Sequence, residues 1–162
     1  MSGIVVRAAG PGEGGALGAI GFAAWAASEF AVHDAGRVDR KALRADFDQL
    51  GVERPDTIIV AELDGQIAGW GARDDRNQHI SDVWVAPEFQ GRGIGTALLA
   101  KLEAEITALG HTTAELETLA GNTRAIGFYE RHGYVVAWRG QKFSSSLGYA
   151  IDKVGMNKNL GK

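Results

Sequence analysis

Apolar residues recur along the chain with two spacings, which predict an alternation of strands and helices. Alternating or continuous β-branched runs predict strands at 4–8, 57–63, 66–72, 79–85 and 112–119, and a closing pair at 134–138 and 149–156. Spacings of three and four residues predict helices from Glu13, from Asp39 or Arg40 to Leu50, from Arg92 or Gly93 to Leu109, and from Asn122 to His132. This order predicts an α/β fold with about seven strands in a mixed sheet and four helices packed on it.

Turn and capping residues fall where these elements need them. Asp64-Gly65 lies between two apolar runs, which is a strong signal for a two-residue hairpin. Pro87 ends the strand that begins at His79, because proline cannot donate to a strand ladder. Asn122 is a good N-cap, and Gly133 stands where a left-handed residue would end the same helix.

Length and composition narrow the class of protein. The 162 residues are the length of one domain, which we expect to span 1–162, and 45% apolar residues indicate a folded globular chain. The absence of cysteine excludes disulfides and thiolate sites, and a net charge of -3 argues against a general nucleic-acid binder. The apolar run 16–27 is shorter than the roughly 20 residues that span a bilayer. It predicts a buried first helix in a cytoplasmic protein that does not enter a membrane.

The most informative segment is 83–99, VWVAPEFQGRGIGTALL. A strand stops at Pro87, and the run 90–95, QGRGIG, opens a long helix. Glycines allow the backbone to approach a ligand closely, and the free amides of a first helical turn attract anions. With Arg92 alongside, the segment predicts a cradle for a diphosphate. It lacks the Lys-Ser/Thr pair of a Walker loop and the third glycine of a Rossmann fingerprint. A second glycine run, 10–15, carries Glu13 where a phosphate would lie, so we interpret it as a connector.

Two motifs give the chain a family resemblance over nearly its whole length. The segment VWVAP at 83–87 followed by QGRGIG resembles the acetyl-CoA signature of the Gcn5-related N-acetyltransferase (GNAT) superfamily. The segments NTRA at 122–125 and FYERHGY at 128–134 are similar to that family's second motif, Asn-x-x-Ala, Phe-Tyr and Gly-Phe/Tyr. The resemblance implies a sheet whose central parallel strands, 79–85 and 112–119, splay apart to hold acetyl-CoA.

The resemblance also implies which residues meet the cofactor. Val83 and Val85 would pair their backbone with the pantetheine arm, amides 91–95 with Arg92 would hold the pyrophosphate, and Asn122 would contact the cofactor from the second helix. Tyr129 would point at the sulfur. The full set of expected cofactor residues is Val83, Trp84, Val85, Gln90, Gly91, Arg92, Gly93, Ile94, Gly95, Thr96, Asn122 and Tyr129.

The implied chemistry is attack of an amine on a thioester. A lysine-like amine with a pKa near 10.4 is protonated at pH 7, and freeing its lone pair costs roughly 4–5 kcal/mol. A proton acceptor is therefore useful, and His79 is the candidate because strand alternation puts it on one face with Ser81, Val83 and Val85. The alternative is a solvated histidine at a strand end. Asp82 is expected to face the other way.

Tyr129 is the candidate proton donor to the leaving thiolate, with core packing on the helical stripe it shares with Ala125 and His132 as the alternative. Trp25, Phe30 and Trp70 are candidates either for an acceptor pocket or for the core, and Glu29 and Asp34 either for ammonium binding or for a solvated face. A structural role at a helix end suits His132.

The sequence therefore predicts an N-acetyltransferase that uses acetyl-CoA and no metal. The expected partner is a small-molecule or peptide amine; the acceptor stays undefined, and the sequence leaves a homodimer open. Two alternatives remain: a regulatory module that binds acyl-CoA without turnover, and a fold that binds a nucleotide other than coenzyme A.

Overall fold

A computed structural model describes residues 3–28, 41, 44–45, 57–74, 76–144 and 148–161. The helix expected from Asp39 or Arg40 to Leu50 falls almost entirely outside these residues. The same holds for Glu29, Phe30 and Asp34.

Seven strands form one sheet, and three α-helices lie in the described part of the chain. The strands are β1 (Ile4–Ala8), β2 (Ile58–Leu63), β3 (Gln66–Arg73), β4 (His79–Val85), β5 (Thr113–Leu119), β6 (Val135–Ser144) and β7 (Tyr149–Asn159). The helices are α1 (Gly14–Ala26), α4 (Ile94–Ala108) and α5 (Thr123–Arg131), with a short 3-10 helix, η2 (Pro87–Phe89), after β4. The predicted strands all form, and the closing pair is longer than expected.

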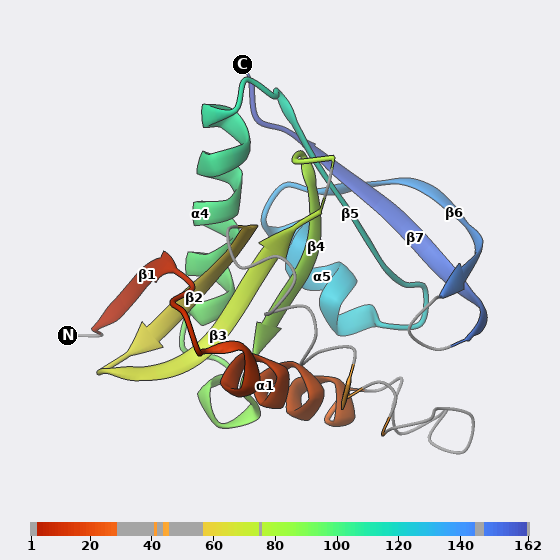
Figure 1. Ribbon diagram of the computed structural model, residues 1–162. Helices are drawn as coiled ribbons and strands as arrows, with labels where there is room; N and C mark the ends of the chain where they lie inside the picture. The colour runs from red at the N-terminus through yellow and green to blue at the C-terminus, as the bar shows by residue number, and fades with distance from the viewer. Residues whose placement is uncertain are drawn as a thin grey trace.

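The sheet is mixed, and its one parallel contact is short. Its strand order is β1-β2-β3-β4-β5-β7-β6, with every neighbouring pair antiparallel except β4 and β5. These two strands pair only at His79 with Glu115 and at Ile80 with Leu116. Beyond Ile80 they separate, and α5 lies beside the opening (Figure 1). The predicted splay of the central parallel strands is confirmed.

The two faces of the sheet carry separate cores. On one face, α4 packs Leu98, Leu99, Leu102 and Ile106 onto the strands, together with Ile80 and Leu116. Leu109, which the same helical spacing predicts on this buried face, is instead 52% exposed because α4 ends before it. On the other face, α1 packs Leu17 and Trp25 against Trp70 of β3. Figure 1 shows α4 and α1 on these opposite faces. Trp25 and Trp70 are therefore core residues, and Trp70 donates its indole N–H to the Leu17 carbonyl at 2.8 Å.

Local sequence signals account for several of the chain reversals. Asp64 and Gly65 have φ values of 52° and 83°, so both central residues of the β2–β3 hairpin are left-handed as this turn type requires. Asn122 caps α5 by accepting the Ala125 amide at 3.2 Å, and Gly133 follows the helix with a φ of 93°. All three features were predicted.

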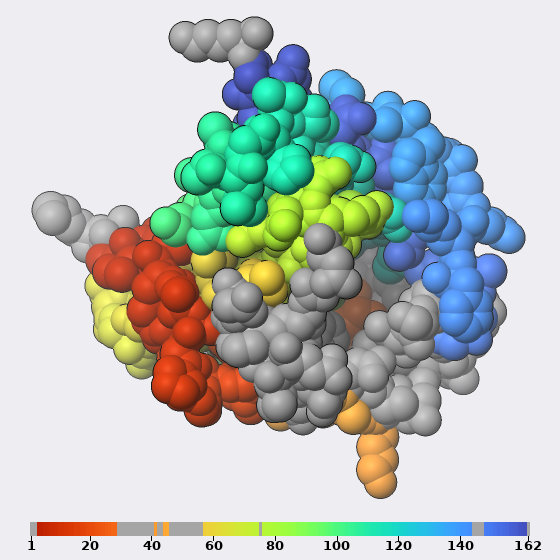
Figure 2. Space-filling model, turned by 45° about the horizontal axis from the view of Figure 1, so that its top comes forward, coloured from red at the N-terminus to blue at the C-terminus, as the bar shows by residue number. Residues whose placement is uncertain are grey.

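Strand β1 and the closing hairpin lie at opposite ends of the sheet. The strand order puts β1 at one edge and β6 at the other, and Figure 2 shows the segments of β1 and α1 (red) and of β6 (blue) on opposite sides of one face. Helix α1 has 13 residues, and none of the helices described here has the length and apolar character needed to cross a membrane.

Candidate active site

Strand β4 turns unpaired backbone groups toward the gap. The Ala86 amide donates to the Ala68 carbonyl on β3 at 2.8 Å. Because successive residues of a strand direct their hydrogen-bonding groups to alternate sides, the N–H and C=O groups of Val83 and Val85 point away from β3. On that side β5 has already separated from β4. One wall of the gap therefore presents a strand edge that can bind an extended ligand.

The mouth of the gap is formed by the glycine-rich start of α4. Gly91 and Gly93 have φ values of 78° and 85°, a conformation that favours glycine. The first amide bonded within the helix is that of Ala97, which donates to the Gly93 carbonyl at 3.0 Å. The amides before it have no acceptor within the helix. A Cβ at Gly95 would lie 3.2 Å from the Phe128 ring, so this glycine allows α4 and α5 to approach closely.

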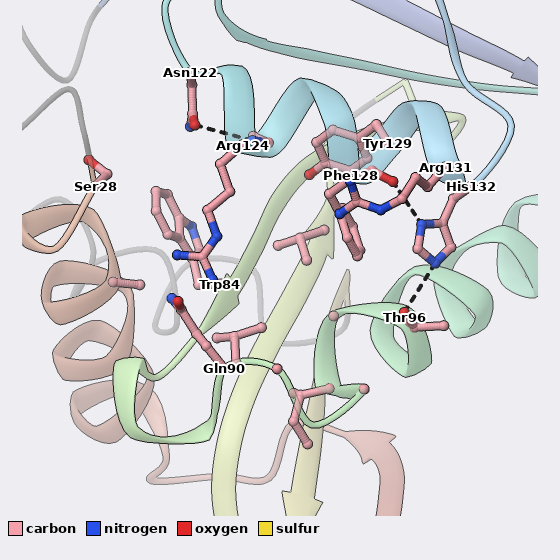
Figure 3. Close-up of a pocket in the computed structure, with 18 of the residues that line it drawn as sticks. Ser28, Trp84, Gln90, Thr96, Asn122, Arg124, Phe128, Tyr129, Arg131 and His132 are labelled. Carbon is pink, nitrogen blue, oxygen red and sulfur yellow. Dashed lines mark hydrogen bonds between the residues drawn. The ribbon is translucent and has the colours of Figure 1, made fainter.

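These elements enclose a cleft of about 570 Å³. Its walls come from the end of α1, from β4, from the start of α4 and from α5 (Figure 3). The expected cofactor residues that line it are Val83, Trp84, Val85, Gln90, Gly91, Gly93, Ile94, Gly95, Thr96, Asn122 and Tyr129. Residues that are far apart in the sequence thus meet in one cavity, as the two motifs predicted.

The cations at this cleft differ from those expected. Arg92 is not among the lining residues, and its guanidinium lies over the Phe89 ring, 5.9 Å from the centroid. Arg124 and Arg131 of α5 line the cleft instead, and Arg124 reaches from α5 toward Trp84 and Gln90 (Figure 3). Their position depends on how α5 packs beside the gap. The sequence offered only their places in the second motif as a signal.

His132 joins the two helices at the cleft. Its Nδ1 lies 2.8 Å from the Phe128 carbonyl oxygen, and its Nε2 lies 3.0 Å from the Thr96 hydroxyl of α4 (Figure 3). The predicted structural role at the end of α5 agrees with these contacts. The imidazole also faces the cavity.

Tyr129 is half-buried between aromatic neighbours. Its ring lies 5.2 Å from that of Phe128 and 5.7 Å from that of Tyr134, both edge to face. Burial and the nearby Asp82 carboxylate raise the pKa of the Tyr129 phenol above its usual value. The phenol is therefore protonated across the neutral range and can donate a hydrogen bond into the cleft.

The expectation that His79 shares a face with Val83 and Val85 is wrong. The β3–β4 pairing passes from Ala72 with Asp82 to Arg73 with Ile80, so Ser81 is the extra residue of a β-bulge. This bulge shifts the alternation by one residue. Ile80, Val83 and Val85 all pack toward α4. His79 therefore lies on the opposite face, with Asp82 and Trp84.

The same bulge brings Asp82 beside the cleft. Its carboxylate accepts the Trp84 indole N–H and the Ser81 hydroxyl, each at 2.9 Å, and Trp84 lines the cleft. Burial raises the pKa of Asp82, although the hydrogen bonds from Trp84 and Ser81 favour its charged form. Asp82 is the acidic residue whose charge acts on Tyr129. The residue pattern did not indicate this place for Asp82, because a bulge leaves no clear mark in the alternation of apolar and polar positions.

His79 lines a second, smaller cavity. Its Nδ1 lies 2.8 Å from the Asp74 carboxylate, and its Nε2 lies 3.9 Å from Glu117 of β5. The structure therefore does not bring His79 and Tyr129 into one cavity. Across the described ranges, no three His, Asp or Glu side chains are grouped so that they could hold a metal ion.

A mixed sheet that opens between two parallel strands, with a glycine-rich helix start at the opening, is the arrangement that the sequence resemblance implied. The chain belongs to the acetyltransferase (GNAT) family, whose family model matches residues 22–134. An acetyltransferase of Pectobacterium atrosepticum is 37% identical over 82 residues, which are 49% of this chain and 58% of that relative. The chain thus matches little more than half of the relative's length.

Solved structures show the same fold over nearly the whole chain. A GCN5-related N-acetyltransferase from Rhodopseudomonas palustris matches with a TM-score of 0.81 and 24% identity, covering 99% of this chain and 98% of that one. A putative acetyltransferase from Salmonella typhimurium, solved with its cofactor acetyl-CoA, matches with a TM-score of 0.69 and 21% identity, covering 99% and 96%. The predicted GNAT-like fold is confirmed.

Proposed function

We propose that this protein transfers the acetyl group of acetyl-CoA to a primary amine by direct attack in a ternary complex. The observation that carries this proposal is the gap between β4 and β5. One wall of the gap is an unpaired strand edge, its mouth is a helix N-terminus, and a protonated phenol faces its interior.

The residues at the cleft fit acetyl-CoA. The Val83 and Val85 backbone can accept and donate hydrogen bonds to the amides of an extended pantetheine arm, as a neighbouring strand would. Free amides at the start of α4 suit a pyrophosphate. The cations of Arg124 and Arg131 add favourable charge for an anionic ligand.

Bound acetyl-CoA supplies an activated thioester, and the protein's own groups manage the protons. Asp82 is the proposed proton acceptor for the attacking amine, in place of His79, because its raised pKa brings it closer to the working pH. When Asp82 takes the proton, its negative charge disappears. The pKa of Tyr129 then falls, since that charge contributes to raising it. Tyr129 can now donate its proton to the sulfur and take up the proton held by Asp82, so the net step moves one proton from the attacking neutral amine to the thiol. An amine that arrives as an ammonium first loses its extra proton to solvent.

Replacing Tyr129 with Phe tests the donor. The substitution keeps the aromatic packing against Phe128 and Tyr134 and removes only the hydroxyl. We expect the turnover rate to fall about 100-fold or more, the usual contribution of a positioned proton donor, with a nearly unchanged Kd for acetyl-CoA. Stopped-flow thiol release and calorimetry measure the two quantities. A full turnover rate in this variant would exclude Tyr129 as the donor.

Thiol release from acetyl-CoA across a panel of primary amines tests the function itself. Release that depends on the amine, with the acetylated amine found by mass spectrometry, is the expected result. Tight acetyl-CoA binding without release with any amine would instead favour a regulatory module.

Thermal shifts distinguish the ligand. Acetyl-CoA at about 100 times its Kd should stabilise the protein by roughly 2.7 kcal/mol, whereas ATP and NAD should leave the melting temperature unchanged. Stabilisation by ATP or NAD alone would contradict the proposed use of the cleft.

A further inference from the structure

The cavity that contains His79 is separate from the cleft at α4. It measures about 130 Å³ and is walled by β4, β5, β6 and β7. Its lining residues are Arg76, His79, Glu115, Leu116, Glu117, Ala137, Trp138, Lys142, Gly155, Met156 and Asn157. The proposed acetyl transfer makes no use of it.

His79 presents an unused hydrogen-bond acceptor to this cavity. The residue is only 8% exposed, and burial lowers the pKa of its imidazole, so the ring is neutral at pH 7. With Nδ1 2.8 Å from Asp74, the tautomer that places the proton on Nδ1 is favoured. Nε2 then carries a lone pair. Within the described part of the chain neither ring nitrogen makes a hydrogen bond of good geometry, and Nδ1 is linked to Asp74 by proximity to its charge. A buried acceptor of this kind calls for a donor from a ligand.

Two lysines already lie at the Glu117 carboxylate: Lys153 Nζ is 3.6 Å from Oε1, and Lys142, which lines the cavity, contacts Oε2. The Nζ of Lys142 lies 2.8 Å from Glu117 Oε2 and 5.0 Å from the centre of the Trp138 ring. The same carboxylate oxygen lies 3.9 Å from His79 Nε2. A carboxylate, an indole face and an imidazole lone pair together form a cation site. The Lys142 side chain is 49% exposed, so it can leave toward solvent and make room for another cation.

This site lies at the closed end of the gap that holds the proposed reaction centre. Pairing between β4 and β5 ends at Ile80 with Leu116, and Glu117 is the next residue along β5. On β4, His79 and Asp82 share a face and are three residues apart, roughly 10 Å along a strand at 3.3 Å per residue. A diamine whose reacting amino group lies at Asp82 can therefore extend its other end along β4 toward His79.

We propose that the acceptor is an aliphatic diamine, whose second ammonium group binds among Glu117, His79 and Trp138 in place of the Lys142 ammonium. This inference rests on the proposed function. One amino group is acetylated beside Asp82 while the other fixes the molecule at the closed end of the gap. The carboxylates of Glu115 and Glu117 and the Trp138 ring favour a cation at this position over a methyl, hydroxyl or carboxylate group, against the opposing charge of Arg76, which also lines the cavity.

The first experiment compares acceptors that differ only at the far end. We expect kcat/KM for at least one of 1,3-diaminopropane, 1,4-diaminobutane and 1,5-diaminopentane to exceed that of butylamine by at least about tenfold, with 4-aminobutanoate the poorest acceptor. If butylamine is acetylated as well as every diamine, the diamine site is refuted while the proposed function stands. If no amine is acetylated, the proposed function fails, and the binding measurement below decides this inference alone.

Binding is measured without acetyl-CoA. In nitrogen-15 NMR spectra, 1,4-diaminobutane should shift the Nε2 resonance of His79, assigned with His79→Gln, and butylamine at the same concentration should not. The absence of any shift at saturating diamine, or an equal shift with butylamine, would overturn the proposal.

Two charge variants should change the use of the diamine in opposite directions. Glu117→Gln removes the carboxylate and should reduce the diamine-to-butylamine ratio of kcat/KM at least about tenfold. Lys142→Gln removes the competing cation and should lower the KM for the diamine several-fold. A purely structural Lys142–Glu117 ion pair predicts no such gain, so a raised KM in Lys142→Gln would contradict the site. Glu130→Gln, an exposed change on α5, is the matched control and should leave the ratio as it is.

Discussion

Ser81 is the unpaired residue of the bulge in β4, and its position decides what the neighbouring side chains face. Without the bulge, His79 would share the face of Val83 and Val85. With it, Asp82 and His79 lie on one face, and the proton chemistry divides between them. Asp82 is placed by hydrogen bonds from Trp84 and Ser81, next to the charge-sensitive Tyr129.

Asp82→Asn tests this assignment, because it should lower the activity and raise the stability of the protein. Activity should fall about 100-fold or more, because asparagine cannot accept a proton, and the acid limb of the pH–rate profile should disappear. Stability at pH 7 should rise. The pKa of Asp82 is higher in the folded than in the unfolded protein. As the pH rises from the unfolded pKa to the folded pKa, ionisation of Asp82 therefore lowers the free energy of unfolding.

The stability gain should vanish below the unfolded pKa of about 3.9, where Asp82 is protonated in both states. Urea unfolding between pH 3 and 7 measures it, with Asp152→Asn, an exposed change on β7, as the control. An activity loss without a change in the pH profile would make Asp82 a positioning residue only.

At the scale of elements, the start of α4 depends on the left-handed backbone of Gly93. Gly12, whose φ of 81° is close to the 85° of Gly93, lies in open space outside the cleft and provides a matched control. Both Gly93→Val and Gly12→Val should lose about 1–2 kcal/mol of stability, the usual cost of this conformation for a residue with a Cβ.

Only Gly93→Val should weaken acetyl-CoA binding, at least about tenfold, because the valine would disturb the amides aimed at the ligand. Calorimetric Kd values for acetyl-CoA with the two variants test whether the start of α4 binds the cofactor. Equal binding by both would show that the helix start does not hold the cofactor.

The other glycine run, at the start of α1, is occupied by the protein's own carboxylate. Glu13 pairs with Arg7 at 2.7 Å and accepts the Gly10 amide at 2.6 Å. The hydrogen bond from Arg7 has the larger effect, and together the two bonds lower the pKa of Glu13 to about 2. The interpretation of this run as a connector agrees with these contacts.

Glu13→Gln should lower the melting temperature at pH 7 by roughly 2–4 °C, for a loss of about 1 kcal/mol. The pKa of Glu13 is lowered in the folded state, so the stabilisation is present above about pH 4.5 and is lost as the pH falls toward 2. The difference from the parent protein in urea midpoint should therefore narrow between pH 5 and 3. A constant difference would assign the effect to packing rather than charge.

Elements with strong local signals were predictable from the sequence. The Asp64-Gly65 hairpin, the Asn122 cap and the left-handed Gly133 after α5 each depend on neighbouring residues, and the structure contains all three. The bulge at Ser81 was not predictable, since it follows from how β3 and β4 pair. For the same reason the sequence supported His79 over Asp82. Only its place in the second motif indicated that Arg124 would lie at the cleft, where Arg92 was expected.

At the scale of the whole molecule, the sheet consists of two parts joined by a short contact. Strands β1 to β4 form one part and β5 to β7 the other, and only two residue pairs connect β4 with β5. Helix α4 spans the joint by packing on strands of both parts. A ligand in the gap would therefore restore the continuity of hydrogen bonding that the two strands lose beyond Ile80.

Hydrogen exchange can test this continuity amide by amide. The Val83 and Val85 amides face the gap, so they should exchange readily in the free protein and at least about tenfold more slowly when acetyl-CoA is bound. The Ala86 amide is bonded to the Ala68 carbonyl of β3 in either case and should change little, which makes it the internal control. Slower exchange at Ala86 as well would indicate general stiffening of the sheet. No change at Val83 or Val85, with acetyl-CoA bound, would mean that the cofactor does not pair with β4, and the cleft would have to hold it through α4 and α5 alone.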